Sequence, residues 1–543
     1  MSLLAKGVSR DMKLNAKQLR LHDARSYKSG LLAAALGIFT FAAANCNGLT
    51  APQTTAEPIW PTNGWQASTP EEQGLDSTKL AGLVDFGTTH SFDSLLIVRH
   101  GKIVAEAYYA PYAPGIPHAQ YSVTKSVIST LTAIASKEGL LDSPNHRVLD
   151  FFDRPSIANL DPRKEAITVQ NLLDMTSGFE WTQQVGNSIP AVKTNEQMFR
   201  SSNWVKFVLD RPMSSAPGDI FNYDSGNPHL LSAILTKLTG ITALDYAKAK
   251  LFGPLGIGDV SWSHDPQGIS SGCTGLWLEP RDMAKIGYLY LRNGKWEGKQ
   301  LLPDSWIDKV RHGTIASALE YSNLFWELAD KHVYFASGLY GQNIFVFPDF
   351  DLVAVTTGRV LFRVNEFADL ISGSVRSDTA IPADPAGAKL LANKIRDVFS
   401  EKPTPVGPAP KTAATISGKV YRFLPNPIQV KSVSLMLTDP QPRYDVEFYP
   451  IDTTKPTPGF AGPMGPDGKY REGEPTYIFW LGVRAVNAVK GTWLDDHTFQ
   501  MNRQIRGLGP EELWTFRFDG DRLNLRVTLT DSNEISIDGE RGG

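Results

Sequence analysis

The chain has 543 residues, 42% of them hydrophobic and 20% charged, and its 54 Lys and Arg against 57 Asp and Glu give a formal net charge of −3. This composition is typical of a globular protein of two or three domains, and it excludes fibrous and intrinsically disordered classes. No basic or acidic run indicates nucleic acid as a partner. Two cysteines, Cys46 and Cys273, are too few for a disulfide scaffold or a Cys-rich metal site.

Residues 1–45 are expected to form an export signal and not part of the fold. A segment rich in Lys and Arg precedes the uncharged run 31–44. That run is shorter than the roughly 20 residues of a membrane span, and it fits the apolar core of a signal peptide followed by small residues. We therefore expect a periplasmic or secreted protein. Membrane attachment through an uncleaved N-terminus, and a lipid on Cys46, stay open as alternatives.

Two folded domains are expected beyond a tether at 46–70. In residues 71–400, strands occur on both sides of a helical middle; the strands are expected at 94–98, 103–109, 333–337, 344–347 and 352–357, and the helices begin near Ser122, Val169 and Gly226. This order predicts an α+β fold, in which an antiparallel sheet is flanked by helices and carries an inserted helical lobe. A stiff Pro-rich linker follows at 401–411.

Residues 412–543 are expected to form a C-terminal all-β domain, a sandwich or a barrel. Trp514, Phe516 and Phe518 alternate with polar residues, and Asp519-Gly520 predicts a hairpin turn before the alternating run 523–529. The Gly- and Pro-rich stretch 453–468 is expected to be a long loop.

The strongest chemical pattern is Tyr121-Ser122-Val123-Thr124-Lys125 at the start of a predicted helix. Ser122 and Lys125 stand three residues apart, so a hydroxyl and an amine are neighbours on the first turn. A lysine freed of its proton can serve as the base for such a hydroxyl. A surface Ser and Lys on an amphipathic helix is the alternative interpretation of this pattern alone.

Two further segments contain groups that could act with this pair. Tyr223, in the polar stretch 221–227 before a helix, could present a phenolic oxygen to the serine as part of a proton relay. The segment 335–343, between two strands, includes Gly338, which allows close approach of the backbone and a main-chain N–H for an oxyanion. A capping loop and a plain hairpin are the respective alternatives.

Together these segments resemble the serine β-lactamase and penicillin-binding-protein superfamily, in its class C-like branch. The similarity spans roughly residues 70–400 and includes 167–178, 251–256 and 280–287. It implies that Ser122 is the acylated nucleophile, Lys125 its general base and Tyr223 the proton shuttle. The implied oxyanion hole is formed by the backbone N–H groups of Ser122 and Leu339.

Two departures from the superfamily pattern bear on the substrate. The strand that usually reads Lys-Thr/Ser-Gly is Ala336-Ser337-Gly338 here, and the usual Tyr-Ser/Ala-Asn is Tyr223-Asp224-Ser225. Within the superfamily the chain is most similar to 6-aminohexanoate-dimer hydrolases and to hydrolases of linear peptides such as linearised microcystin. The substrate-binding residues that this resemblance implies are Trp181, Ser225, Cys273, Ser337, Gly338 and Tyr340.

A second serine motif lies at 268–272. Gly268-Ile269-Ser270-Ser271-Gly272 matches G-x-S-x-G, but that motif needs a strand before it and a helix after it, and here it predicts a loop. No H-E-x-x-H and no phosphate-binding loop occurs, so neither a metal nor another cofactor is expected.

The sequence thus predicts an exported serine hydrolase that forms an acyl-enzyme and cleaves amide bonds of linear peptides or peptide-like oligomers. A carboxylesterase for short acyl esters is one alternative. A catalytically weak penicillin-recognising binding protein is the other. A small molecule or linear peptide is the expected partner, and the oligomeric state is not predicted.

Overall fold

In the computed structural model of the chain, the described residues are 58–183, 193–313, 315–316, 319–450, 459–478, 483–529 and 534–542. Residues Glu57–Gly543 form one compact unit. The predicted export signal and residues 46–57 of the predicted tether lie outside the described residues. Within these ranges no helix is both long enough and apolar enough to cross a membrane.

The first domain is built on a nine-stranded sheet with the strand order β1-β3-β2-β14-β13-β12-β11-β10-β9. All neighbours are antiparallel except β1 and β3. The strands are Gln66–Ala67 (β1), Phe92–Arg99 (β2), Lys102–Tyr108 (β3), Ile315–Ala316 (β9), Glu320–Ser322 (β10), Phe325–Leu328 (β11), Val333–Gly338 (β12), Gln342–Phe347 (β13) and Leu352–Gly358 (β14). All five strands expected in this domain are confirmed.

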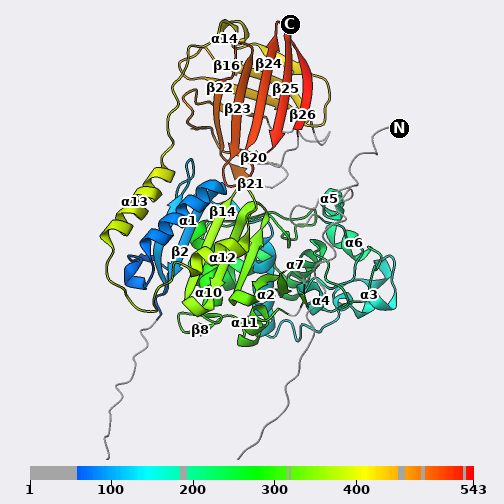
Figure 1. The fold of residues 1–543 in the computed structure, drawn as a ribbon. Coiled ribbons are helices and arrows are strands. Elements are labelled where there is room, and N and C mark those ends of the chain that lie inside the picture. The colour runs from blue at the N-terminus through cyan, green and yellow to red at the C-terminus, as the bar shows by residue number, and fades with distance from the viewer. Residues whose placement is uncertain are drawn as a thin grey trace, which may run out of the picture. The chain divides into compact units, whose positions relative to one another are not determined.

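Helices cover both faces of this sheet (Figure 1). On β2, Leu95 and Ile97 point to one core and Leu96 and Val98 to the other, because successive strand residues face opposite sides. The first core packs under α1 (Ser77–Thr89), α12 (Val364–Ser372) and α13 (Pro385–Phe399), and the second under α2 (Val123–Lys137) and α10 (Pro280–Leu291). The sheet is therefore buried on both faces, and α2 begins in the second core.

The predicted helical lobe is inserted between β3 and the later strands of the sheet, and its helices lie beside α2 in Figure 1. Its helices are Pro162–Ala166 (α3), Val169–Leu173 (α4), Thr194–Arg200 (α5), Trp204–Leu209 (α6), Gly226–Thr239 (α7), Ala243–Ala247 (α8) and Gly253–Leu255 (α9). A small sheet of His118–Ala119 (β4), Ser261–Trp262 (β5) and Leu276–Leu278 (β6) follows the order β4-β6-β5. After α10 come the hairpin of Lys295–Trp296 (β7) with Lys299–Gln300 (β8), and Asp304–Arg311 (α11).

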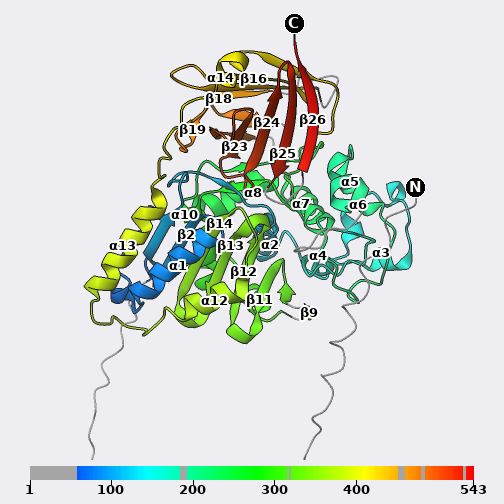
Figure 2. The ribbon, with the colours of Figure 1, turned by 45° about the horizontal axis from the view of Figure 1, so that its top comes forward.

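The C-terminal domain is a single antiparallel sheet of ten strands in the order β18-β17-β16-β15-β26-β25-β24-β23-β22-β19. Its strands are Val420–Phe423 (β15), Val430–Met436 (β16), Arg443–Phe448 (β17), Phe460–Pro463 (β18), Arg471–Glu472 (β19), Asn487–Trp493 (β22), Thr498–Ile505 (β23), Glu512–Asp519 (β24), Arg522–Leu529 (β25) and Glu534–Arg541 (β26). Figure 2 shows β23 to β26 side by side. Thr476–Ile478 (β20) and Val483–Ala485 (β21) form a separate hairpin.

This sheet curls into a nearly closed barrel around one core. Buried residues from strands across the sheet, among them Phe423, Tyr444 and Trp514, belong to a single apolar cluster. The chain after β18 bridges to β22 at Gly465 and Lys490, which brings the two ends of the sheet together. The expected hairpin is confirmed: β24 and β25 pair along their length around a turn at Gly520.

Two details differ from the sequence-based expectation. The stretch 453–468 was expected to be all loop, but its described part contains β18, because Phe460 is buried in the core and pairs with Val446. A short helix, Lys411–Ile416 (α14), begins the domain that was expected to be all-β, and Ala413 and Ile416 anchor it through buried side chains. In the stretch 453–468 a single aromatic residue stands among Gly and Pro, and this gives too weak an alternation for a strand to be recognised.

Candidate active site

Ser122 lies at the N-terminus of α2. The helix forms because Val127, Leu131 and Ile134 recur at helical spacing and are buried in the core beneath the sheet. Ser122 occupies the N-cap position, yet its side chain caps no backbone N–H. Its own backbone N–H has no acceptor among the described residues. The hydroxyl and the N–H of Ser122 are therefore both available for chemistry.

Lys125 lies one turn further along the helix and is only 2% exposed. Its Nζ donates to Ser122 Oγ over 2.9 Å and to the backbone carbonyl of Cys273 over 3.0 Å. A buried ammonium needs such acceptors because it has lost its water shell. One hydrogen bond thus links the amine to the hydroxyl, the arrangement in which a lysine can take the proton of an attacking serine.

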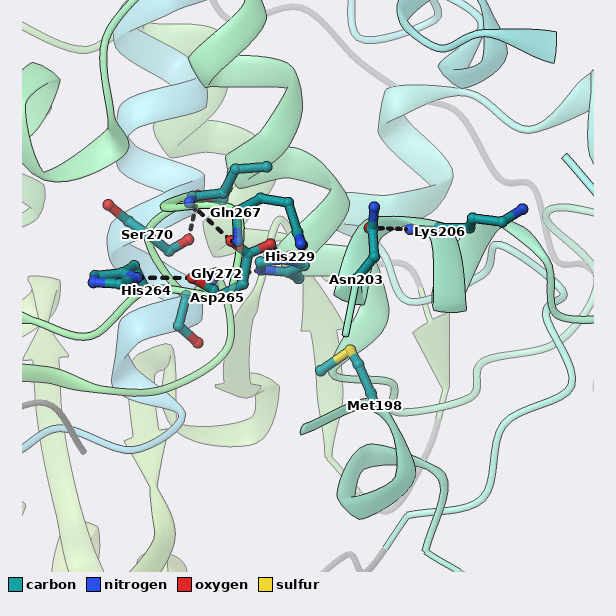
Figure 3. Close-up of polar contacts among 12 residues, drawn as sticks. Met198, Asn203, Lys206, His229, His264, Asp265, Gln267, Ser270 and Gly272 are labelled. Atoms are coloured by element: carbon teal, nitrogen blue, oxygen red, sulfur yellow. Dashed lines mark hydrogen bonds and ion pairs between the residues drawn. The ribbon is translucent and has the colours of Figure 1, made fainter. Parts of the chain in front are cut away.

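A buried histidine–aspartate pair fixes the loop that presents the Cys273 carbonyl (Figure 3). His229 Nε2 lies 3.1 Å from Asp265 Oδ2, and both side chains are fully buried. Asp265 Oδ1 also accepts two backbone N–H groups of the loop, and His229 Nδ1 accepts that of Gly272 over 3.4 Å. Although burial alone would raise it, the pKa of Asp265 is lowered by these hydrogen bonds. The pair therefore connects α7 to the residue preceding Cys273.

Gly272 fits this loop because it has no side chain. A β-carbon there would lie 1.9 Å from the carbonyl oxygen of Pro228, which belongs to the first turn of α7. The loop therefore packs directly against the helix backbone. The G-x-S-x-G sequence 268–272 has no regular strand or helix, as predicted, and its Ser270 hydroxyl accepts the backbone N–H of Leu244.

Tyr223 lies in the polar segment that precedes α7. Lys125 Nζ is 5.1 Å from the centroid of its ring, so the structure brings the three predicted catalytic side chains together. Trp326 of β11 stacks on the tyrosine ring with centroids 5.7 Å apart, and Tyr321 of β10 packs against Trp326 edge to face. Tyr223 and Trp326 are both partly exposed. An aromatic wall therefore borders the predicted proton shuttle.

Asp224, next to Tyr223, is a buried carboxyl close to the lysine. Its Oδ1 accepts the backbone N–H groups of Gly226 and Asn227 at the start of α7. Burial raises the pKa of Asp224 to about 7, and these hydrogen bonds and the charge of Lys125 act in the opposite direction. The sequence marked this position only as a departure from a family pattern.

The end of β12 passes beside the backbone of Ser122. A β-carbon at Gly338 would lie 2.4 Å from Gln120 O and 3.3 Å from Ser122 N, so the approach requires glycine. Leu339 follows directly and is 38% exposed. The two residues predicted to supply oxyanion-hole N–H groups therefore border the same place, and a carbonyl oxygen held there would receive two donors.

Other predicted substrate-binding residues have protein partners. Trp181, Ser225 and Cys273 are buried, with exposed fractions of 5%, 3% and 1%. Trp181 Nε1 and Ser225 N both donate to Gln183 Oε1 over 3.0 Å. Burial raises the pKa of the Cys273 thiol, although the charge of Lys125 opposes this. A substrate contact of these three side chains remains a prediction.

The remaining three predicted substrate-binding residues lie at the end of β12. Gly338 is buried there, and Ser337 and Tyr340 are partly exposed. Ala336, where the superfamily pattern has a cation, is 1% exposed and pairs with Ile344 inside the sheet. Across the described ranges, no group of three or more His, Cys, Asp or Glu side chains could hold a metal ion.

The profile of the Beta-lactamase family matches residues 71–359, more than half of the 543-residue chain. The chain belongs to the Beta-lactamase family. The 6-aminohexanoate-dimer hydrolase of Paenarthrobacter ureafaciens is 24% identical over 330 residues, which cover 56% of this chain and 79% of the relative. The resemblance inferred from the motifs and the predicted fold class are thereby confirmed. Membership of this family makes the chain a hydrolase of the serine type, a group that includes amidases and esterases.

Solved structures similar to this Beta-lactamase family member include an octameric penicillin-binding protein homologue from Pyrococcus abyssi. Its TM-score is 0.43 at 16% identity, and the match covers 86% of this chain and all of the other. EstCE1, a hydrolase with promiscuous acyltransferase activity, gives a TM-score of 0.43 at 17% identity and covers 60% of this chain and 98% of its own.

Sequence reasoning missed the groups that hold the predicted catalytic residues. The acceptor for Lys125 is a backbone carbonyl, which any residue supplies, so Cys273 gave no signal for that role. Trp326 and Asp224 were not recognised because their positions depend on how β11 and α7 pack. The pair of His229 and Asp265 had no recognisable spacing either, and only the fold brings it under Gly272.

Proposed function

We propose that this protein hydrolyses amide bonds of linear peptides or peptide-like oligomers through an acyl-enzyme on Ser122, and that it acts after export. The observation that carries the proposal is the contact of the buried Lys125 Nζ with Ser122 Oγ, beside the backbone N–H that Gly338 approaches.

In this mechanism Lys125, as the free amine, takes the proton of Ser122 while Oγ attacks the substrate carbonyl carbon. The oxyanion that forms accepts the N–H groups of Ser122 and Leu339. Tyr223 then delivers a proton to the leaving nitrogen and regains one from the Lys125 ammonium, while the C–N bond breaks and leaves the acyl group on Oγ. Water, deprotonated by the same relay, releases the acid and restores the serine.

The amide preference is supported by the similarity to 6-aminohexanoate-dimer hydrolase and by the side chain at Ala336. A buried methyl group at this position provides no cation for the carboxylate of a β-lactam. The partly exposed Trp326 and Tyr223 offer apolar surface to the non-reacting part of a linear substrate.

The test is to treat the full chain with a fluorophosphonate probe, map the adduct by mass spectrometry and assay a linear peptide, a p-nitrophenyl ester and nitrocefin. We expect an adduct on Ser122 and turnover of the peptide. Ser122→Ala should abolish both without changing the melting temperature by more than a few degrees, because Ser122 is a partly exposed residue at a helix entrance. Ser270→Ala tests the other nucleophile motif, and the adduct on Ser122 should persist in this variant.

The outcomes separate the alternatives. Ester turnover without peptide turnover would favour a carboxylesterase. Acylation by nitrocefin without turnover would favour a penicillin-recognising binding protein. The absence of any adduct on Ser122 would contradict the proposed mechanism.

A further inference from the structure

Two tyrosines with unusual backbone conformations flank the predicted oxyanion hole. Tyr121, immediately before Ser122, has φ +46°, and Tyr340, immediately after Leu339, has φ +65°. A bulky residue with positive φ pays for steric crowding, and such a conformation persists only where the surroundings hold it. The position of each oxyanion N–H therefore depends on what holds the neighbouring tyrosine.

The two tyrosines contact one another and a turn of the C-terminal domain. Their rings pack edge to face with centroids 5.3 Å apart. The hydroxyl of Tyr121 donates to the backbone carbonyl of Leu508, in the turn between β23 and β24. The backbone N–H of Ala119, two residues before Tyr121, donates to the carbonyl oxygen of Gly507 over 2.8 Å. The turn thus binds the segment that leads into the nucleophile at two points.

Glycines allow this turn to come so close. Gly507 and Gly509 have φ +74° and +104°. A β-carbon at Gly507 would lie 2.1 Å from Pro117 O, and one at Gly509 would lie 2.9 Å from Tyr340 Cδ2 and 3.5 Å from the Tyr121 hydroxyl. The turn therefore approaches both tyrosines with its backbone. A side chain added at Gly509 would push the turn away from them.

The base of the turn is fixed by packing and charge. Ile505, Val483 and Ala485 share a buried apolar cluster with Ala119 and Trp277, and Tyr121 and Leu508 pack against it. Arg506 is 6% exposed; its guanidinium lies over the ring of Tyr112, 5.4 Å from the centroid, and pairs with Glu472. Ile505 and Arg506, at the base of the turn, therefore both contact buried groups of the first domain.

We propose that the β23–β24 turn of the C-terminal domain positions the oxyanion hole, and that Tyr121, Leu508 and Gly509 are positioning residues of the reaction. The inference rests on the proposed function. The turn holds Tyr121 and Tyr340 in their unfavourable conformations and so aims the N–H groups of Ser122 and Leu339 at one point. The C-terminal domain then raises the rate of acylation, but none of its groups touches the reacting atoms.

The test compares full-length variants by the rate of fluorophosphonate labelling of Ser122, by kcat and KM for p-nitrophenyl acetate and by inhibition with phenylboronic acid, which forms a tetrahedral adduct on an active-site serine. Tyr121→Phe removes only the hydroxyl. Gly509→Ala adds a methyl group against Tyr340. Gly520→Ala is the matched control, because it also has positive φ in the C-terminal domain and a β-carbon there meets nothing within 4 Å.

We expect kcat and the labelling rate to fall about tenfold in Tyr121→Phe and about 100-fold in Gly509→Ala, since small displacements of a catalytic group have effects of this size. The affinity for phenylboronic acid should fall in parallel while KM stays nearly constant, because the oxyanion hole binds the tetrahedral state and not the ground state. Gly520→Ala should label like the wild type.

Wild-type rates and boronate affinity in Tyr121→Phe would overturn the proposal, even if Gly509→Ala fails to fold. Equal losses in Gly509→Ala and Gly520→Ala would also overturn it, because they would show a general effect of a less stable domain. Failure of the wild type to label at Ser122 would instead contradict the proposed function.

Discussion

At the scale of single residues, one buried carboxyl group of the site has an unusually high pKa. Asp224 is fully enclosed beside Tyr223, and burial raises its pKa to about 7, well above the ordinary value of 3.8. In the unfolded chain the carboxyl would lose its proton near that ordinary value. Between the two values the folded state holds a proton that the unfolded state does not.

This difference gives a prediction about stability and pH. By linkage, the free energy of unfolding falls as pH rises from about 4 to about 7 wherever the native state binds the extra proton. Asp224→Asn keeps the shape and stays neutral, so we expect its stability to decline less than that of the wild type over this interval. Urea denaturation of both proteins at several pH values measures the effect. Parallel curves for the two proteins would contradict the assignment.

At the scale of secondary-structure elements, the lysine depends on the contact between α7 and the β5–β6 loop. Gly272 lies against the carbonyl of Pro228, and His229, one residue further along α7, accepts its N–H. The next residue of the loop presents the carbonyl that binds Lys125. A displacement of this loop would therefore move the carbonyl oxygen to which the Lys125 amine donates.

Gly272→Ala tests that connection. The added methyl group would clash with the α7 backbone, so we expect the loop to move, the Cys273 carbonyl to leave Lys125 and kcat for ester or peptide hydrolysis to fall about 100-fold. Steady-state kinetics measures the loss. Gly258→Ala serves as control, because a β-carbon there meets nothing within 4 Å. Wild-type kcat in both variants would show that the carbonyl does not matter to the reaction.

How much the sequence reveals also differs among elements. The two strands before Ser122 and the three around Gly338 follow from their apolar runs, and the pairing of Ser122 with Lys125 follows from helical spacing. The Cys273 carbonyl could not be predicted, since a main-chain acceptor depends on the path of a loop. Nor could β18, whose single buried aromatic, Phe460, stands among glycines and prolines. Long-range packing, which no local pattern encodes, decides all of these.

At the scale of the whole molecule, the two domains share a buried surface next to the nucleophile. Ile505 and Val483 come from the C-terminal domain, and Ala119 and Trp277 from the first domain. Removal of buried apolar atoms from such a cluster costs the transfer free energy of those atoms and leaves a cavity.

Ile505→Ala should therefore weaken the connection between the domains. We expect a loss of about 2–3 kcal/mol in the free energy of unfolding and a denaturation curve that separates into two transitions, since each domain has its own core. Tryptophan fluorescence and circular dichroism report both. Val527→Ala, inside the barrel, should lower stability without separating the transitions. A single transition in both variants would contradict the coupling.

The order of strands in the barrel has a consequence for biogenesis. β26, the last strand along the described chain, pairs with both β15 and β25. A nascent chain that has already emerged through β25 still lacks the strand that joins the two halves of this sheet. If the turn after β23 is needed to aim the N–H of Ser122, then Ser122 emerges from the ribosome long before this turn can form. Acylation of Ser122 would then be slow during synthesis and would reach its full rate only after β26 has completed the C-terminal sheet.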